Sequence, residues 1–558
     1  MKPLRILLIF MVIMLCVFGP QMQAQYYSQN KVQYKDFEFR KLTTEHFDNY
    51  YYPIEKEGAR VAARMAEKWY GRYVTLFNHE LSSRQPLILY ASHSDFEQTN
   101  IIQGQIGEGT GGVTEGLLRR IVLPFGGPLA ETDHVIGHEL VHAFQYDMGS
   151  DTSGGLFSRG PAAAYLPLWL IEGMAEYFSI GPLDANTAMW MWDAAQSKRL
   201  PKYKQLDRPE YFPYRYGQAL LAYIGGTYGD AAVPQLLESA LGSRDVDMAI
   251  RRVTGISPDT LILDWQAAIH DLYDPVETRT KGVDQYGKQL TGQSRQGTEL
   301  NIAPALSPDG TLMLYFSERN LFFIDMFLAN AKTGKVQNAI VSRERNPHLE
   351  SLEFINSAGA WDAAGRRIAY GAIEQGRPVL YARNVETRKI EHRVLLPSLG
   401  EILNPTWAPD GSAIAFSAMT GGYTDLFIYH LDTDQLEQVT NDLYAELQPA
   451  WAPDGRSIAL VTDRFTTDLS ILSTGDYQLA LYDLQSKDFT RLQAFQHGKH
   501  INPQWSSDGH SLYFLSDVDG ITNIYRLDTT NGKLVKITNL YTGVSGITAI
   551  SPALSVAS

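Results

Sequence analysis

A repeat that begins after residue 280 constrains the fold of this 558-residue chain more than any other feature. Each copy joins a large apolar residue, a turn and an alternating apolar strand, and the turn is Asp-Gly in every copy but the second, where Ala364 replaces the aspartate. Strand-rich repeats of about 44 to 55 residues are typical of propeller blades, because a small sheet buries its faces only against its neighbours. An irregular β-sandwich does not explain five copies in phase. The copies are PALSPDGTLMLYFS from Pro304, GAWDAAGRRIAYGA from Gly359, PTWAPDGSAIAFSA from Pro405, PAWAPDGRSIALVT from Pro449 and PQWSSDGHSLYFLS from Pro503.

The end of the sequence starts a sixth copy of the repeat. Residues 550–558 read ISPALSVAS and align with IAPALSPDG at 302–310. We expect one of two arrangements. Either this last strand closes the ring together with residues 286–291, or the natural chain continues past Ser558.

The W-x-P-D-G core of the repeats resembles the TolB-like (WD40-like, PD40) propeller family. The resemblance covers residues 282–558 and implies an all-β propeller domain of five repeats with an incomplete sixth. It implies a fold and a possible protein partner, but no particular ligand.

Composition excludes one broad class of function. The formal net charge is −14, and acidic and basic residues are interspersed without a basic tract. Nucleic-acid binding needs a concentrated cationic face. We therefore expect no nucleic-acid partner.

The first 24 residues have the pattern of a secretory signal peptide. Lys2 and Arg5 precede an apolar run at 6–18, and Ala24 offers a small residue for cleavage. The alternative is an uncleaved anchor helix. No other long apolar segment follows, so the mature chain should have no transmembrane span. Cys16, the only cysteine, lies in this segment, and we expect an exported protein of a bacterial periplasm or envelope.

Residues 30–280 mix helical and strand patterns, which predicts an α+β domain before the propeller. Residues 86–92 form an apolar strand run, and 111–125 resemble two short strands or a hairpin with glycines where the backbone approaches another group closely. Apolar residues at helical spacing predict the helices, which we expect at 55–77, 132–148, 166–179, 217–228 and, as several helices, 232–272.

The segment VIGHELVHAFQYD at 135–147 contains the motif H-E-x-x-H. His138 and His142 lie four positions apart, so on a helix both imidazoles face the same side and can bind one ion. Glu139, next to the first histidine, can reach a water on that ion as a general base. His134 lies one turn earlier, and we interpret it as a helix-start histidine rather than a ligand.

A catalytic zinc site needs a third protein ligand and one open position. The segment LPLWLIEGMAEYFS carries Glu172 and Glu176, again four apart, within an apolar run. Two carboxylates in such surroundings need a cation. The pattern therefore predicts that one carboxylate binds the metal while the other orients a ligand histidine from behind.

HELVH followed by WLIEGMAEY resembles the gluzincin metallopeptidases of the peptidase MA group, especially the M1-like and M61-like enzymes. The resemblance covers about residues 35–275. It implies one Zn²⁺ per chain, held by His138, His142 and Glu172. It also implies that Glu176 supports the first histidine from behind the ligands, and that Glu139 is the catalytic base.

The same family has a tyrosine in a P-Y-x-x-G segment that stabilises the oxyanion. Here the resemblance assigns that role to Tyr214, in FPYRYGQ, with Tyr216 as the alternative. The G-A-M-E-N strand of the M1 aminopeptidases is absent, and the corresponding text is GTGGVTEGLLRR. Gly112 and Glu115 are the candidates for substrate binding there, and exopeptidase specificity is not implied.

We therefore expect an exported zinc endopeptidase that hydrolyses peptide or protein substrates, with a propeller that recognises a substrate or partner. The alternative is an envelope binding or scaffold protein whose metal site is not catalytic. A propeller-bearing serine hydrolase is excluded, because the chain has no G-x-S-x-G motif.

Overall fold

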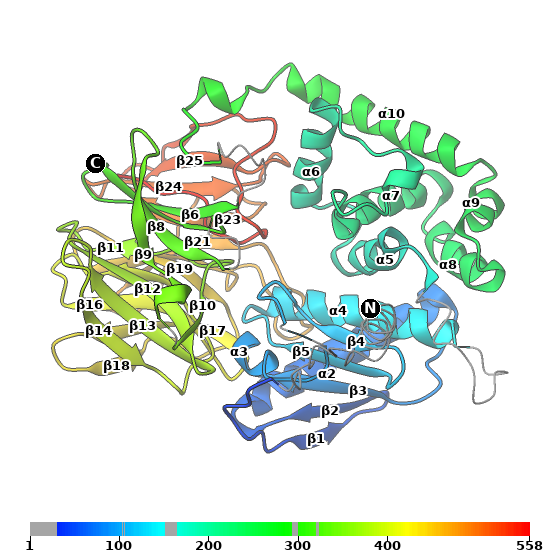
Figure 1. Cartoon of the computed structure of the whole chain (residues 1–558), viewed down its shortest axis with the longest axis horizontal. Helices are drawn as coiled ribbons and strands as arrows, with labels where there is room; N and C mark the ends of the chain where they lie inside the picture. The colour runs from blue at the N-terminus through cyan, green and yellow to red at the C-terminus, as the bar shows by residue number, and fades with distance from the viewer. Residues whose placement is uncertain are drawn as a thin grey trace, which may run out of the picture.

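A computed structural model describes residues 31–557, except 103, 105, 151–164, 293–299, 320–322 and 347. The expected signal segment and Cys16 lie outside the described residues. Figure 1 shows two parts: helices and a small sheet formed by the first half of the chain, and a propeller formed by the second half. The structure thus has the expected order, a mixed helix-and-sheet part followed by an all-β part.

The chain first forms a five-stranded sheet with the order β1-β2-β3-β5-β4. Strands β2, β3 and β5 run parallel, and β1 and β4 are antiparallel edge strands. The expected hairpin at 111–125 is the β4–β5 pair. The elements are β1 (Arg40–Thr43), β2 (Phe47–Tyr51), α2 (Lys56–Phe77), β3 (Gln85–Tyr90), α3 (His93–Phe96), β4 (Val113–Glu115) and β5 (Arg120–Pro124).

Helix α4 (Leu129–Met148) packs beside this sheet and is followed by a helical layer. The sequence pattern missed one of these helices, α6, whose N-cap Asp184 accepts a bond from the backbone of Thr187. It also placed the start of α7 too late, because Pro213 occupies the first turn, where its missing N–H costs nothing. The layer comprises α5 (Leu168–Ile180), α6 (Ala185–Gln196), α7 (Pro213–Tyr228), α8 (Ala232–Ser243), α9 (Val246–Thr254) and α10 (Pro258–Glu277).

Helices α5 and α7 touch through a pair of glycines. A Cβ on Gly173 would lie 2.4 Å from the backbone of Gly217, and a Cβ on Gly217 would lie 2.1 Å from the carbonyl oxygen of Trp169. Both distances are impossible for a real side chain, so only glycine permits this approach. The close contact brings the first turn of α7 against the face of α5 that carries Glu172 and Glu176.

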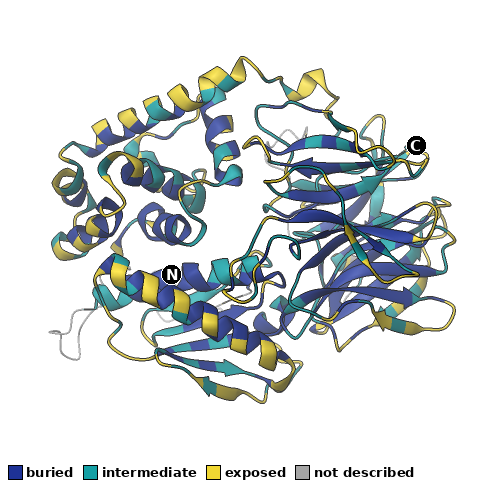
Figure 2. Ribbon diagram, turned by 180° about the vertical axis from the view of Figure 1, so that it is seen from behind, coloured by how far each residue is buried: buried dark blue, intermediate teal, exposed yellow. Residues whose placement is uncertain are grey.

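The second half of the chain forms five blades, each a small antiparallel sheet. Figure 2 shows that most residues along the blade strands are buried, whereas α10 presents an exposed stripe to solvent. The blades are β6 (Asn301–Leu306) to β9 (Val336–Val341), β10 (Leu349–Leu352) to β14 (Ile390–Leu395), β15 (Ile402–Trp407) to β18 (Gln435–Gln438), β19 (Glu446–Trp451) to β22 (Phe489–Arg491), and β23 (His500–Trp505) to β26 (Leu534–Lys536). Their remaining strands are β7 (Leu312–Ser317), β8 (Asp325–Asn330), β11 (Ala360–Trp361), β12 (Arg367–Glu374), β13 (Arg377–Asn384), β16 (Ala413–Thr420), β17 (Tyr423–His430), β20 (Ser457–Thr462), β21 (Gln478–Asp483), β24 (Ser511–Ser516) and β25 (Asn523–Asp528).

Three of the four repeated tryptophans join consecutive blades, whereas the indole Nε1 of Trp451 has no hydrogen-bond partner among the described residues. The indole Nε1 of Trp361 donates to the carbonyl of Ala305 at 3.0 Å. Trp407 donates to Ala360 at 3.3 Å, and Trp505 donates to the preceding blade at 3.0 Å. A buried indole N–H needs a partner, and for these three tryptophans a neighbouring blade supplies it.

The turn before each second strand is stabilised by an aspartate side chain. In the third blade, for example, Asp410 accepts a bond from the backbone N–H of Ser412 at 3.0 Å. The second blade lacks this aspartate because Ala364 replaces it. There Asp362 accepts from the backbone N–H groups of Arg366 and Arg367 instead, at 2.8 and 3.0 Å. The degenerate copy of the repeat therefore keeps its turn.

The last described residues connect the innermost strands of several blades. The backbone N–H groups of Ala553 and Leu554 donate to Asn502 Oδ1 at 2.8 and 2.7 Å, and Gln448 donates to the carbonyl of Ile550 at 2.6 Å. The N–H of Leu306 in the first blade donates to Ser555 at 2.9 Å. The expected pairing with residues 286–291 is wrong: residues 550–557 form no strand and bridge the first and fifth blades instead.

Replacing Asn502 by alanine should destabilise the propeller by about 2–4 kcal/mol, because two backbone donors lose their acceptor in a buried place. Asn502 also has a φ of 56°, a conformation that asparagine tolerates better than alanine. Urea denaturation followed by circular dichroism measures the change.

Asn531→Ala, at an exposed turn of the same blade, is the matched control, and its effect should be small. Equal stability of the Asn502 variant and this control would show that the closing segment does not hold the ring together.

The two parts of the molecule meet along a seam. Arg64 and Lys68 on α2 donate to the carbonyls of Ser470 and Leu472 in the fourth blade, at 3.0 and 2.9 Å. The N–H of His93 donates to Glu401 before β15 at 3.2 Å. None of the helices in the described part of the chain combines the length and the apolar character needed to cross a membrane.

Candidate metal centre

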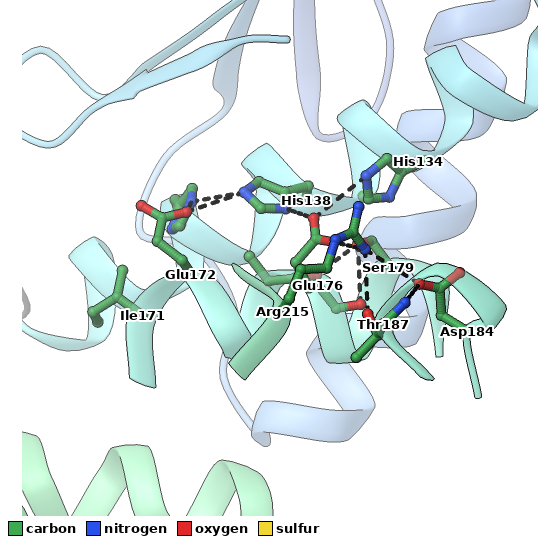
Figure 3. Close-up of polar contacts among 12 residues, drawn as sticks. His134, His138, Ile171, Glu172, Glu176, Ser179, Asp184, Thr187 and Arg215 are labelled. Atoms are coloured by element: carbon green, nitrogen blue, oxygen red, sulfur yellow. Dashed lines mark hydrogen bonds and ion pairs between the residues drawn. The ribbon is translucent and has the colours of Figure 1, made fainter. Parts of the chain in front are cut away.

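Helices α4 and α5 bring together the histidines and glutamates that the sequence singled out. His138 and His142 are buried residues of α4, and Glu172 and Glu176 of α5 lie on either side of His138 (Figure 3). All four residues are mostly buried. A single turn of helix separates the members of each pair, so both pairs face one centre.

Three ligand atoms converge at this centre. The Nε2 atoms of His138 and His142 lie 3.2 Å apart. Glu172 Oε2 lies 3.3 Å from each of them. A tetrahedral zinc ion with bonds of 2.0–2.1 Å sets its ligands about 3.3 Å apart, so this triangle matches one face of that tetrahedron. The fourth vertex carries no protein ligand among the described residues, and the donor set therefore fits a catalytic zinc site.

The far nitrogen of each histidine contacts a second residue. Glu176 Oε1 lies 3.0 Å from His138 Nδ1, and Gln145 Oε1 lies 2.8 Å from His142 Nδ1. Gln145 is itself fixed, because its amide donates to the carbonyl of Ile171 at 3.0 Å. An acceptor at Nδ1 places the proton there and leaves Nε2 free to bind a metal.

A second group of possible ligands overlaps the first. His134, His138 and Glu176 also present donor atoms close together, and His134 Nε2 lies 3.5 Å from Glu176 Oε1. However, Arg215 Nη1 lies 3.3 Å from Glu176 Oε2 (Figure 3). The guanidinium already supplies a positive charge beside this carboxylate, which disfavours a further cation. Glu176 thus contacts His138 and Arg215 outside the triangle of the first set.

The protonation of these groups reflects the same attraction for positive charge. Burial lowers the pKa of His138, but hydrogen bonds to Glu172 and Glu176 raise it more, so that the pKa reaches about 10. Burial raises the pKa of Glu172 and of Glu176, but the neighbouring histidines lower both pKa values well below the ordinary range. The two carboxylates thus stay ionised in a buried place and stabilise cations there.

Glu139 lies beside the ligands and is fixed by the edge strand. Thr114 Oγ1, on β4, donates to Glu139 Oε2 at 2.7 Å. A Cβ on Gly112 would lie 3.1 Å from Glu139 Oε1, so the glycine lets the strand pass close to the carboxylate. Glu115, the other candidate for substrate binding, instead forms an ion pair with Arg120 across the hairpin.

The two candidate tyrosines on α7 face different surroundings. The ring of Tyr214 stacks on that of His138 with centroids 5.7 Å apart, and burial and the nearby Glu172 carboxylate raise the pKa of its hydroxyl. Tyr216 packs against Tyr211, 5.2 Å away, and contacts neither ligand histidine. Of the pair, the structure brings Tyr214 to the metal centre.

Three residues at this centre were missed by the sequence analysis. Gln145 carried a local signal, because it follows His142 by three positions on the same helix. No local sequence signal marked Thr114 or Arg215, because Thr114 reaches the centre from strand β4 and Arg215 reaches it from helix α7. Their contacts depend on tertiary packing alone.

Residues 345–468 match the family model described as the TolB beta propeller domain (PD40). The match runs from the second blade into the fourth, so this part of the propeller is TolB-like. The match lies wholly within the propeller and does not extend to the residues around His138.

Several solved structures are similar over part of the chain. TolB from Acinetobacter baumannii is 18% identical with a TM-score of 0.33, and the match covers 49% of this chain and 59% of TolB. TolB from Agrobacterium tumefaciens is 16% identical with a TM-score of 0.35, covering 43% and 80% of the two chains. A prolyl endopeptidase is 13% identical with a TM-score of 0.32, covering 50% and 42%.

Proposed function

We propose that the protein is an exported zinc metallopeptidase of a bacterial periplasm or envelope that hydrolyses internal bonds of peptides or proteins. The observation that carries the proposal is the triangle of His138 Nε2, His142 Nε2 and Glu172 Oε2, with edges of 3.2–3.3 Å. Glu139 beside it supports a catalytic role, because a purely structural zinc site needs no base next to its ligand.

Zinc, when bound, would supply Lewis acidity that polarises a peptide carbonyl and lowers the pKa of water. Two side chains of the protein would carry out the proton transfer and stabilise the developing charge. Glu139 would accept a proton from the attacking water and deliver it to the nitrogen of the leaving amine. Tyr214 would donate its hydroxyl proton in a hydrogen bond to the carbonyl oxygen as negative charge develops there.

Strand β4 is suited to hold the substrate. It pairs with β5 on one side only and ends its sheet, so its outer edge can bind an extended peptide by backbone hydrogen bonds. Gly112 precedes this strand and Thr114 lies within it, and both contact Glu139. A peptide bound along β4 would therefore lie next to the base.

The second candidate function is that of an envelope scaffold that binds a partner through its propeller, with a metal site that is not catalytic. The match of residues 345–468 to the TolB propeller model supports it. A substrate route along the propeller axis is disfavoured, because residues 550–555 bond to innermost strands there. For the peptidase, this favours recognition at the outer surface of the propeller.

The purified mature protein should bind about one zinc ion per chain and cleave members of a broad peptide library. Elemental analysis and mass spectrometry of the digests measure the two properties. A chelator should abolish cleavage, and added zinc should restore it. Absence of any transition metal after zinc reconstitution would contradict the metal site. A zinc-loaded protein that cleaves nothing would favour the scaffold.

A further inference from the structure

A row of aromatic rings leads away from the metal centre. Tyr214 stacks on His138, and the ring of Phe212 lies 4.9 Å beyond that of Tyr214. The ring of Trp190, on α6, follows at 5.8 Å from Phe212. Alternate side chains of an extended peptide are about 6.6 Å apart, which is close to the spacing of this row.

The outer two rings are open to solvent. Phe212 is 42% exposed and Trp190 is 40% exposed, although most aromatic side chains in the described part of the chain are buried. Exposed aromatic rings that adjoin one another mark binding surfaces more often than isolated apolar residues do. The row begins at a candidate catalytic residue, and its outer ring follows two steps later, at 4.9 and 5.8 Å. A side chain bound at that outer end therefore belongs to a residue about three positions from the reacting bond.

The row ends at a cavity of about 400 Å³. This volume lies within the range of about 300–1,000 Å³ typical of sites for small ligands. Helix α6 and the segment that joins it to α7 contribute most of the wall, α7 contributes Tyr216, and the propeller contributes the remainder through the loop that follows β26. The lining includes Met189, Trp190, Tyr211, Tyr216, Thr542 and Ser545.

The position of the propeller loop is fixed by contacts with α6. A Cβ on Gly543 would lie 2.4 Å from Met189 Sδ, so the loop approaches the helix as closely as its backbone allows. Ile521 of the same blade packs with Met189 and Trp192 in one buried cluster. The propeller wall of the cavity is therefore part of a packed interface.

The charged groups around the cavity have partners. Asp193 forms an ion pair with Arg199 at 2.7 Å, and Glu210 lies 3.6 Å from Arg208. Paired charges at the rim do not select a charged ligand. The aromatic lining instead favours a bulky apolar group, which would bury its surface against the rings.

We infer that this row and cavity form a subsite for a bulky apolar or aromatic side chain of a peptide substrate, with the last blade as one wall. The inference rests on the proposed peptidase function and names its substrate class. It also gives the propeller a role in substrate recognition, because Thr542 and Ser545 line the cavity in which the side chain would bind.

The test compares two peptides that differ only by phenylalanine or alanine about three residues from the bond cleaved in the library. Wild type should prefer the phenylalanine peptide in kcat/KM by at least about 10-fold. Trp190→Ala should remove most of this preference, and Ser545→Trp should reduce it by filling the cavity. Leu272→Ala, an exposed apolar residue of α10, and Ser486→Trp, in an exposed turn of the fourth blade, should leave it unchanged.

Binding supplies an independent measurement. Calorimetry on Glu139→Gln should give a lower Kd for the phenylalanine peptide than for the alanine peptide, and Trp190→Ala in the same background should abolish the difference. If wild type cleaves neither peptide, the peptidase proposal fails, and a Trp190-dependent difference in Kd still supports the subsite. The subsite proposal would be overturned if the ratio of kcat/KM for the phenylalanine peptide to that for the alanine peptide is the same in wild type, Trp190→Ala and Ser545→Trp.

Discussion

Replacing Glu139 by glutamine should lower peptide cleavage by about 10²–10⁴-fold, the loss typical of a missing general base. Glutamine has nearly the same size and leaves both histidines in place. Its amide can still receive the bond from Thr114 that holds the carboxylate now. Fold and zinc content should therefore survive, while the amide cannot accept a proton from water.

Three measurements separate the outcomes: kcat/KM, zinc per chain and the melting temperature. Glu57→Gln, an exposed glutamate of α2, is the control and should match wild type in all three. If Glu139→Gln cleaves as fast as wild type, the cleavage belongs to another site or to a contaminant. If it loses zinc or unfolds, Glu139 acts in structure rather than in proton transfer.

This result would also distinguish the two proposed functions. A scaffold with a structural metal site gains nothing from a carboxylate held beside the ligand triangle. Burying such a carboxylate costs free energy unless a partner compensates. Thr114 provides part of that compensation through its hydrogen bond, and a carboxylate at this place has a role in the proposed hydrolase but none in the proposed scaffold.

The propeller could be predicted from sequence because its determinants are local. The aspartate and glycine of the turn are adjacent in four of the five copies, and the strand that follows alternates with period two. The tryptophans could be recognised as part of the repeat. Their hydrogen bonds between blades could not be predicted, because Trp361 bonds to Ala305 and Trp505 to Ala450, which lie in the preceding repeats. The repeat therefore predicts that blades form, but it does not predict the hydrogen bonds between them.

The closure of the ring could not be predicted, because it depends on contacts between residues that are far apart in the sequence. Residues 550–557 look like the first strand of a sixth blade, and the pattern suggested either a strand paired with residues 286–291 or a natural chain that continues past Ser558. In the structure they bond to side chains of Asn502 and Gln448. Those side chains are available because the innermost strands bulge at these positions, where φ is positive. A bulge of this kind leaves no simple periodic signal.

At the metal centre, spacing predicted each pair of residues but not how the pairs meet. Four-residue intervals put His138 with His142 and Glu172 with Glu176 on common helix faces. The distance between the two helices, and so the 3.3 Å contacts, depends on packing across α4, α5 and α7. The glycine contact between Gly173 and Gly217 shows how closely that packing is set.

Glu172→Ala should remove most of the zinc affinity, whereas Glu176→Ala should weaken it by about 10–100-fold, the loss typical of a residue that orients a ligand. Glu172 supplies one of three ligand atoms, and no other carboxylate oxygen lies in that triangle among the described residues. Glu176 contacts His138 through the nitrogen that faces away from the triangle. Its loss would leave the ring free to turn but would not remove a ligand.

Competition with a chromophoric chelator measures both affinities on the folded proteins. Glu238→Ala, an exposed glutamate of α8, is the control and should bind zinc as wild type does. The reverse ranking would place the ion in the other group, between His134, His138 and Glu176. That outcome would also require Arg215, now 3.3 Å from Glu176, to move away when the metal binds. The ranking of the two glutamates therefore tests the geometry of the triangle directly, independently of whether any substrate is found.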